Sequence, residues 1–189
     1  MRLEKFTTKF QTAISDAQSL AVGRDHQYIE PEHVITAMLN QTGGSVRTVF
    51  KTAGVNLNAL RSALSETIEK LPRVQGTGGD VQLGKDTVQL LNMCDKQAQQ
   101  FKDKFISSEL FILAAIQSNA RIASVLKNTG ATIENISHAI NEVRNGLAVT
   151  DQNAEDVREA LDKYTSDLTE RAEQGALDPV IGRDDEIRR

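Results

Sequence analysis

The sequence predicts an all-α protein in which two tandem four-helix repeats pack as one pseudo-twofold domain, followed by a linker and a helical tail. Apolar residues recur at helical spacing through most of the 189 residues. The same order of helix starts and stops occurs twice along the chain. No segment has the alternation of apolar and polar residues, or the hairpin turn, that is typical of strands.

The first repeat is expected over residues 6–71. Its first helix runs from about Thr8 to Val22, because the apolar residues between them share one helical face. A second helix, a short third and a longer fourth follow. Glycine, proline and capping residues mark their boundaries: Gly23, Pro31, Gly54, Asn56 and Pro72.

The second repeat is expected over residues 83–146, after a glycine-rich loop at residues 72–84. Asp86, Ser107 and Thr132 are expected to cap its first, second and fourth helices, because their side-chain oxygens can accept a bond from a free amide. Its third helix is expected to end near Gly130. Together, the two repeats form the domain predicted over residues 1–146.

The two repeats also match residue by residue. Residues 28–32 (Tyr-Ile-Glu-Pro-Glu) align with residues 105–109 (Phe-Ile-Ser-Ser-Glu) at an offset of 77. Further along, Gly54 matches Gly130 at an offset of 76. One residue is therefore lost before the third helix of the second repeat.

The chain changes character after Arg144. Residues 147–158 are polar and weakly patterned, and this is typical of a linker. A helix is expected from about Ala154 to Tyr164, so residues 159–189 are interpreted as the start of another domain. Asp184 looks like the N-cap of a helix that is unfinished at Arg189. We therefore expect the chain to be a fragment.

Charge and composition exclude several classes of function. The net charge is −4 with both signs interspersed, so we expect no nucleic-acid binding, which requires clustered lysine and arginine. No apolar run is long enough to span a membrane, and no signal peptide precedes the first helix. The single cysteine forms no internal disulfide. These features predict a cytoplasmic protein without a membrane partner.

One nucleotide-binding pattern is nearly complete. Gly79, Gly84 and Lys85 satisfy most of the phosphate-loop motif, but Asp86 replaces the hydroxyl residue that ligates magnesium. A carboxylate at this position repels phosphate, and no strand precedes the loop. We interpret these residues as a connector between the repeats.

No catalytic or metal site is predicted. His26, His33 and His138 do not have metal-ligand spacing with another histidine or cysteine. Cys94 falls on the apolar face of its helix, as a core residue does. A small hydrolase remains a minor alternative, because no nucleophile is marked by its local sequence.

Both the repeat and the tail resemble a known family. Residues 6–10, 29–33 and 105–110 are similar to the duplicated Clp N-terminal repeat. Residues 163–172 and 177–189 resemble the beginning of the first ATPase domain of Clp-class AAA+ unfoldases. Residues 76–81 are most similar to the protein disaggregases of that class. The resemblance extends from Met1 to Arg189.

The resemblance implies a module that engages unfolded or aggregated polypeptide. Thr7, Asp103 and Glu109 match family positions proposed for substrate engagement. It also implies an apolar groove nearby, for which Leu91 and Leu110 are candidate lining residues, although both fit the core equally well. Residues 102–104 are equally typical of a solvated turn. Glu109 is also favoured simply by its place near a helix start.

For the full-length protein, the resemblance implies a homohexameric ATPase that uses ATP and magnesium and works with the DnaK chaperone system. Val180 and Ile181 would face the adenine of ATP. The Walker A and Walker B residues would lie beyond Arg189, so we expect this chain to be a monomer that requires no cofactor and hydrolyses no ATP. An alternative is that the domain docks a folded adaptor protein.

Overall fold

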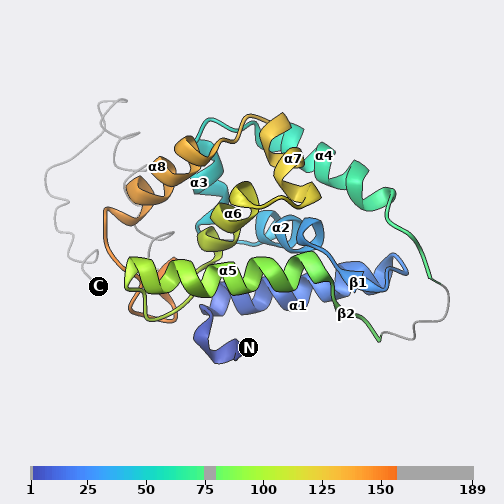
Figure 1. Cartoon of the computed structure of the whole chain (residues 1–189), viewed down its shortest axis with the longest axis horizontal. Helices are drawn as coiled ribbons and strands as arrows, with labels where there is room; N and C mark the ends of the chain where they lie inside the picture. The colour runs from blue at the N-terminus through green and yellow to red at the C-terminus, as the bar shows by residue number, and fades with distance from the viewer. Residues whose placement is uncertain (1, 75–79, 157–189) are drawn as a thin grey trace, which may run out of the picture.

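The protein is described by a computed structural model that covers residues 2–74 and 80–156 (Figure 1). Within these residues the structure is mostly helical, so the predicted all-α class is confirmed. Most of the expected tail helix lies outside the described residues, as do Val180, Ile181 and Asp184.

The first repeat forms the predicted helices. A 3-10 turn, η1 (Leu3–Lys5), precedes α1 (Thr8–Gly23), α2 (Pro31–Asn40), α3 (Val46–Thr52) and α4 (Leu57–Glu69). Asn56 caps α4 as expected, because its side-chain oxygen accepts a bond from the Ala59 amide at 3.0 Å. At the start of α2, the Glu30 amide donates to Nδ1 of His33 at 2.9 Å.

The second repeat consists of α5 (Lys85–Phe101), α6 (Ser108–Gln117), α7 (Arg121–Asn128) and α8 (Ile133–Arg144). Thr132 caps α8, as predicted. The predicted cap at Asp86 is wrong: Gly84 is the N-cap of α5, and Asp86 lies in its first turn. Ser107 precedes α6, but its hydroxyl accepts a bond from Arg144 instead of capping a helix amide.

Two short parallel pairings join the repeats. Strand β1 (Tyr28–Ile29) pairs with β2 (Gln82–Leu83), and Phe6 forms an isolated bridge with Ile106. The expectation of no strand is therefore wrong in detail, because two-residue strands are too short to show an alternating pattern. The Thr7 amide donates to the Ile106 carbonyl at 2.9 Å, and the Gly84 amide donates to the Ile29 carbonyl at 3.0 Å. These two bonds are related by the 77-residue offset, which gives the domain its pseudo-twofold arrangement.

The repeats share one core. The first helices of the two repeats begin 77 residues apart and the fourth helices begin 76 apart. In Figure 1, α2 and α6 lie centrally, while α1 and α5 run along the lower side. Contacts of α3 with α8 and of α4 with α7 interleave the repeats. The rings of Phe6, Phe10 and Phe111 pack edge to face at the centre, with centroids 4.8 and 5.8 Å apart.

Candidate functional site

The three polar residues expected at the site lie together, but they are buried. Thr7 precedes α1, Glu109 lies in the first turn of α6, and both residues are 0% exposed. Asp103 follows Lys102, whose left-handed backbone ends α5, and the Asp103 side chain is also 0% exposed. None of these three side chains is therefore exposed at the surface of the domain.

Arg144 holds the two carboxylates together. Its Nε donates to Glu109 Oε2 at 2.8 Å, and its Nη1 and Nη2 donate to the two oxygens of Asp103 at 3.1 and 2.9 Å. The guanidinium also lies 5.0 Å from the centre of the Phe101 ring. Burial acts to lower the pKa of Arg144, but the charges of Glu109 and Asp103 and their hydrogen bonds raise it overall. No sequence pattern pointed to this residue, because Arg144 is the last residue of α8 and lies far along the chain from both acids.

Glu155 joins the same cluster from beyond the repeats. Its Oε2 accepts bonds from the Thr7 hydroxyl and from the amide and hydroxyl of Ser108, the latter two at 3.0 Å. Ser45 Oγ lies 2.7 Å from Glu109 and 3.3 Å from Glu155. The amides at the start of α6 favour a carboxylate there. The cluster therefore connects both repeats to residue 155.

The segment that follows α8 packs against the domain. Lys104 donates its amide to the Val149 carbonyl at 2.7 Å, and the Thr8 amide donates to the Gln152 carbonyl at 3.0 Å. Val149 and Glu155 are buried. Residues 149–156, which were expected to form part of a linker, are thus held to the beginnings of α1 and α6, while the predicted domain boundaries themselves stay predictions.

The second repeat places Glu109 where the first places Glu32. Glu32 is 0% exposed and accepts two bonds from Arg121, at 3.0 and 3.2 Å. By the repeat offset of 76, Arg121 is the counterpart of Ser45. Arg121 bonds to Glu32 and Ser45 bonds to Glu109, so the buried glutamate of each repeat is bound by the equivalent position of the other repeat. The hydrogen bond from Glu32 is the largest cause that raises the pKa of Arg121.

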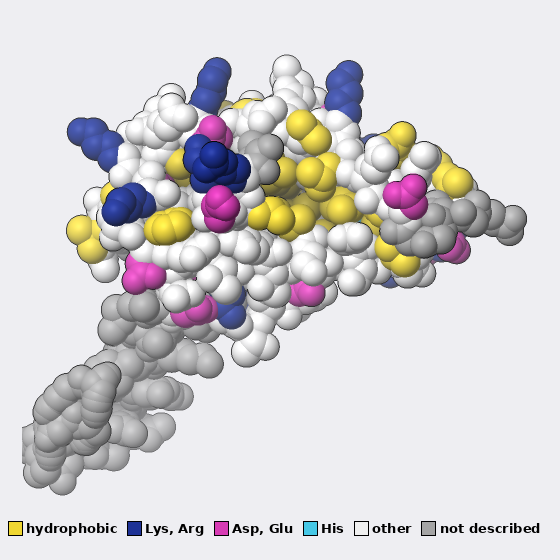
Figure 2. Space-filling view, turned by 90° about the horizontal axis from the view of Figure 1, so that it is seen from below, with side chains coloured by type: hydrophobic (Ala, Val, Ile, Leu, Met, Phe, Trp, Pro, Cys, Tyr) yellow, Lys and Arg dark blue, Asp and Glu magenta, His cyan; other side chains and the backbone are white. Residues whose placement is uncertain are grey.

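The two candidate groove residues lie in the core. Leu110 is 0% exposed and Leu91 is 5% exposed, so neither lines an open groove. Apolar surface is instead offered by Tyr28 of β1, Leu83 of β2 and Val88 of α5, each about two fifths exposed. We call these three residues the hydrophobic surface. Figure 2 shows hydrophobic side chains gathered across the face that holds α1 and α5.

Cys94, His26 and His33 are all buried inside the domain. Cys94 is fully buried, and this burial raises the pKa of its thiol. His26 Nδ1 lies 2.9 Å from His33 Nε2, a contact that their sequence spacing did not predict. Within residues 2–74 and 80–156, no cluster of three or more histidine, cysteine or acidic residues is arranged to hold a metal.

The space beside Gly84, a glycine of the incomplete phosphate-loop motif, is filled by another side chain of the protein. A Cβ at Gly84 would lie 2.6 Å from Oε1 of Glu30, so a carboxylate already fills the space in front of α5. Gly79 lies outside the described residues. The arrangement around Gly84 is that of a connector packed against α2.

Among the described residues, no single helix is long and apolar enough to cross a bilayer. The pair α6 and α7 meets the length and composition together, but the two helices are bent by 97° relative to each other.

Comparison with solved structures supports the fold. The N-terminal domain of Hsp104 from Candida albicans superposes with a TM-score of 0.72 over 80% of this chain and 99% of that one, at 20% identity. The N-domain of ClpV from Vibrio cholerae gives a TM-score of 0.60 over 78% of this chain and 89% of that one, also at 20% identity. At these identities the likeness concerns the fold.

Sequence comparison gives the family. The chaperone protein ClpB of Vibrio vulnificus is 56% identical over all 189 residues, and that of Pseudomonas putida is 52% identical. In each case the chain spans 22% of the relative's length. Residues 5–129 match the Clp repeat (R) N-terminal domain. The chain therefore belongs to the family of Clp repeat N-terminal domains.

Proposed function

We propose that this chain is the substrate-engaging N-terminal module of an ATP-dependent protein disaggregase. The observation that carries the proposal is the 56% identity, over the whole chain, to a protein named chaperone ClpB. In this proposal, the full-length protein is a cytoplasmic homohexamer that uses ATP and magnesium, works with the DnaK system and takes unfolded or aggregated polypeptide from this domain. The chain itself needs no cofactor.

The hydrophobic surface supplies the contact with the client. Burial of exposed apolar side chains is the main favourable contribution in recognition of unfolded chains, and Tyr28, Leu83 and Val88 expose such side chains on β1, β2 and α5. A small site gains little over the cost of ordering a client, so the affinity is weak, about micromolar or poorer.

Thr7, Asp103 and Glu109 act in this proposal as positioning residues. They fix the beginnings of α1 and α6 through Arg144 and Glu155. Leu91 and Leu110 belong to the core of the domain. Substitutions at these residues are expected to weaken client binding together with the stability of the domain.

Titration of the chain with reduced, carboxyamidomethylated lactalbumin, followed by amide chemical shifts, tests the proposal. The shifts are expected to cluster at Tyr28, Leu83 and Val88. The variant Val88→Ser should bind several-fold more weakly at unchanged stability, because its side chain is 42% exposed. Lys127→Ser, on α7 of the second repeat, is the control. Shifts scattered evenly over the domain would contradict the proposal.

Adaptor docking is the second candidate. A solved complex of a ClpV N-domain with a VipB peptide has the same fold, with a TM-score of 0.58 at 21% identity, and supports peptide or adaptor recognition by such domains. A pull-down from lysate separates the two functions. One folded partner at a one-to-one ratio favours adaptor docking, whereas a broad set of unfolded proteins favours client engagement.

A further inference from the structure

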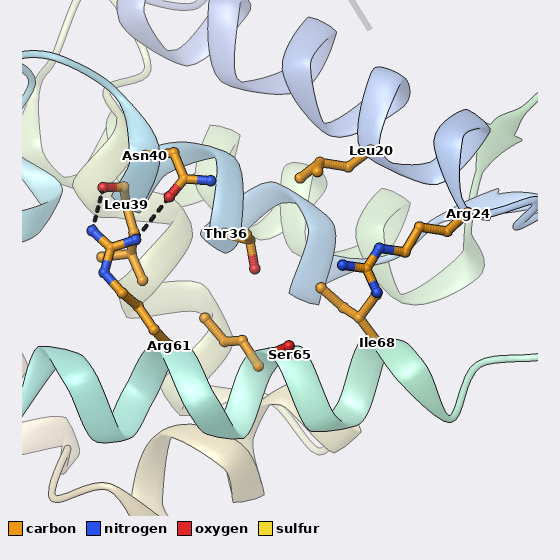
Figure 3. Close-up of a pocket in the computed structure, with 9 residues that line it drawn as sticks. Leu20, Arg24, Thr36, Leu39, Asn40, Arg61, Ser65 and Ile68 are labelled. Carbon is orange, nitrogen blue, oxygen red and sulfur yellow. Dashed lines mark hydrogen bonds between the residues drawn. The ribbon is translucent and has the colours of Figure 1, made fainter.

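A cavity of about 210 Å³ lies between α1, α2 and α4 (Figure 3). Its walls are largely aliphatic and come from all three helices: Leu20, Leu39, Leu64 and Ile68. A cavity of about 150 Å³ in another protein holds benzene. This one therefore has room for one aliphatic side chain.

One wall of the cavity carries a hydroxyl with no partner. Thr36 Oγ1 is inaccessible to solvent and has no hydrogen-bond partner among the described residues. Figure 3 shows this oxygen pointing into the space between α2 and α4. An unpaired buried hydroxyl is unfavourable for folding.

Arginines mark the two ends of the cavity. Arg61 and Arg24 lie at opposite ends in Figure 3, and none of the residues that line it is acidic. Arg61 uses two of its five N–H donors on Asn40 Oδ1 and the Leu39 carbonyl, at 2.7 and 2.8 Å. Arg24 pairs with Glu69 at 2.6 Å, but that carboxylate is also 4.0 Å from Arg73. Positive charge therefore exceeds negative charge around the opening.

The second repeat has no such cavity-forming residues at the matching positions. By the repeat offsets, Leu113 stands in place of Thr36, Phe101 in place of Arg24, and Arg144 in place of Ile68. Leu113 is packed in the core, and Arg144 is turned toward Asp103 and Glu109. The combination of cavity, free hydroxyl and paired arginines is thus specific to the first repeat and is not needed to form the fold.

We propose that this cavity is a docking site for a partner polypeptide segment in which one aliphatic side chain is flanked on both sides by carboxylates. The aliphatic side chain fills the cavity beside Thr36, and the carboxylates face Arg24 and Arg61. The site lies apart from the hydrophobic surface and selects by charge, so it goes beyond the proposed engagement of unfolded clients.

The test uses a short fluorescein-labelled peptide that has one leucine between two glutamates in an otherwise alanine- and serine-based sequence. Fluorescence anisotropy should show saturable binding that weakens with added salt, because carboxylate–arginine pairs at a surface are screened. Thr36→Leu, which copies the second repeat, should abolish binding and leave thermal stability equal or higher.

Two controls separate this site from the hydrophobic surface. A peptide with lysine in place of glutamate should not bind, and Val88→Ser should bind the glutamate peptide as the parent chain does. Equal binding of the peptide by the Thr36→Leu variant, equal binding of the lysine peptide, or no binding at all overturns the docking site. Loss of lactalbumin binding in Val88→Ser tests the proposed function separately, so the two failures are distinguishable.

Discussion

Arg144 is in direct contact with the buried carboxylates of both Asp103 and Glu109. Replacement by methionine, which has a similar length and no charge, leaves both acids buried without this partner. We expect Arg144→Met to lower the free energy of unfolding by about 3–5 kcal/mol, the usual effect of breaking a buried ion pair. Urea denaturation followed by circular dichroism measures this change.

Arg121→Met is the matched control for that variant. Arg121 also pairs with a buried glutamate, but its own side chain is 47% exposed, so water can reach the site that it vacates. Its loss should cost clearly less than the loss of Arg144. Equal losses of unfolding free energy in the two variants would mean that burial does not determine how much Arg144 contributes to stability.

The histidine pair predicts a dependence on pH. Burial is the largest cause that lowers the pKa of His33, to about 4, with further lowering by His26, Arg24 and Arg121; burial also lowers the pKa of His26. As the pH falls below about 6.5, these two histidines bind protons in the unfolded chain but remain neutral in the folded chain, so protonation favours unfolding. The free energy of unfolding should therefore fall between pH 6.5 and 4, by at most about 3 kcal/mol from His33.

Melting temperatures of the parent chain and of His33→Gln between pH 7 and 4.5 measure this effect. The variant should lose less stability over the interval because it lacks one of the two titrating rings. His138→Gln is the control, since the His138 side chain is 74% exposed. An identical pH profile for His33→Gln and the parent would rule out the histidine pair as its source.

At the scale of the element, two glycines predict opposite outcomes: Gly84, the N-cap of α5, and Gly23, the last residue of α1. Gly84→Ala brings a methyl group within 2.6 Å of the Glu30 carboxylate, which must move away from α5. We expect a loss of about 1–2 kcal/mol in the free energy of unfolding, as for other overpacked sites. Gly23→Ala meets no atom within 4 Å and should be neutral or slightly stabilising, because alanine favours a helix.

Thermal denaturation of the two glycine variants, compared with the parent chain, measures both effects. A stable Gly84→Ala variant would show that the Glu30 side chain rearranges at no cost.

The helices could be predicted from the sequence because their signals are local. Pro31, Asn56 and Thr132 begin helices where expected, since each acts on amides within its own first turn. The strands at residues 28–29 and 82–83 could not be predicted, because a two-residue strand is too short to show an alternation of apolar and polar residues. The sequence favours Asp86 as the cap of α5 because Gly84, the actual N-cap, has no side chain that marks a helix start.

The candidate site was harder to predict for a physical reason. Thr7, Asp103 and Glu109 were chosen by resemblance, and they do lie together, but their burial depends on Arg144 and Glu155. Glu155 is 148 residues from Thr7. No local pattern in the sequence reports a contact over that distance. Leu91 and Leu110 fitted both a groove and the core, and only packing could decide for the core.

At the scale of the whole molecule, the interleaved core predicts one cooperative unit. Because α3 packs against α8 and α4 against α7, neither repeat can bury its apolar face alone. Urea unfolding followed by far-ultraviolet circular dichroism and by tyrosine fluorescence should give coincident transitions. Leu60→Ala in the first repeat and Ile136→Ala in the second, both 0% exposed, should shift that same transition by about 2–5 kcal/mol.

Two separate transitions, each moved by only one of these variants, would contradict a single cooperative unit. Each transition would then belong to one repeat, namely the repeat whose variant shifts it.

The two parallel pairings described above are reciprocal. The segment that leads into α1 pairs with the second repeat at Phe6 and Ile106, and the segment that leads into α5 pairs with the first repeat at Leu83 and Ile29. Such an exchange is the geometry of an isologous homodimer whose two subunits have been fused end to end. Fusion frees each half from the requirement of identity, which a true dimer imposes on every residue. One half accordingly carries the arginine that pairs with its buried acids, while the other has an open cavity at the matching position.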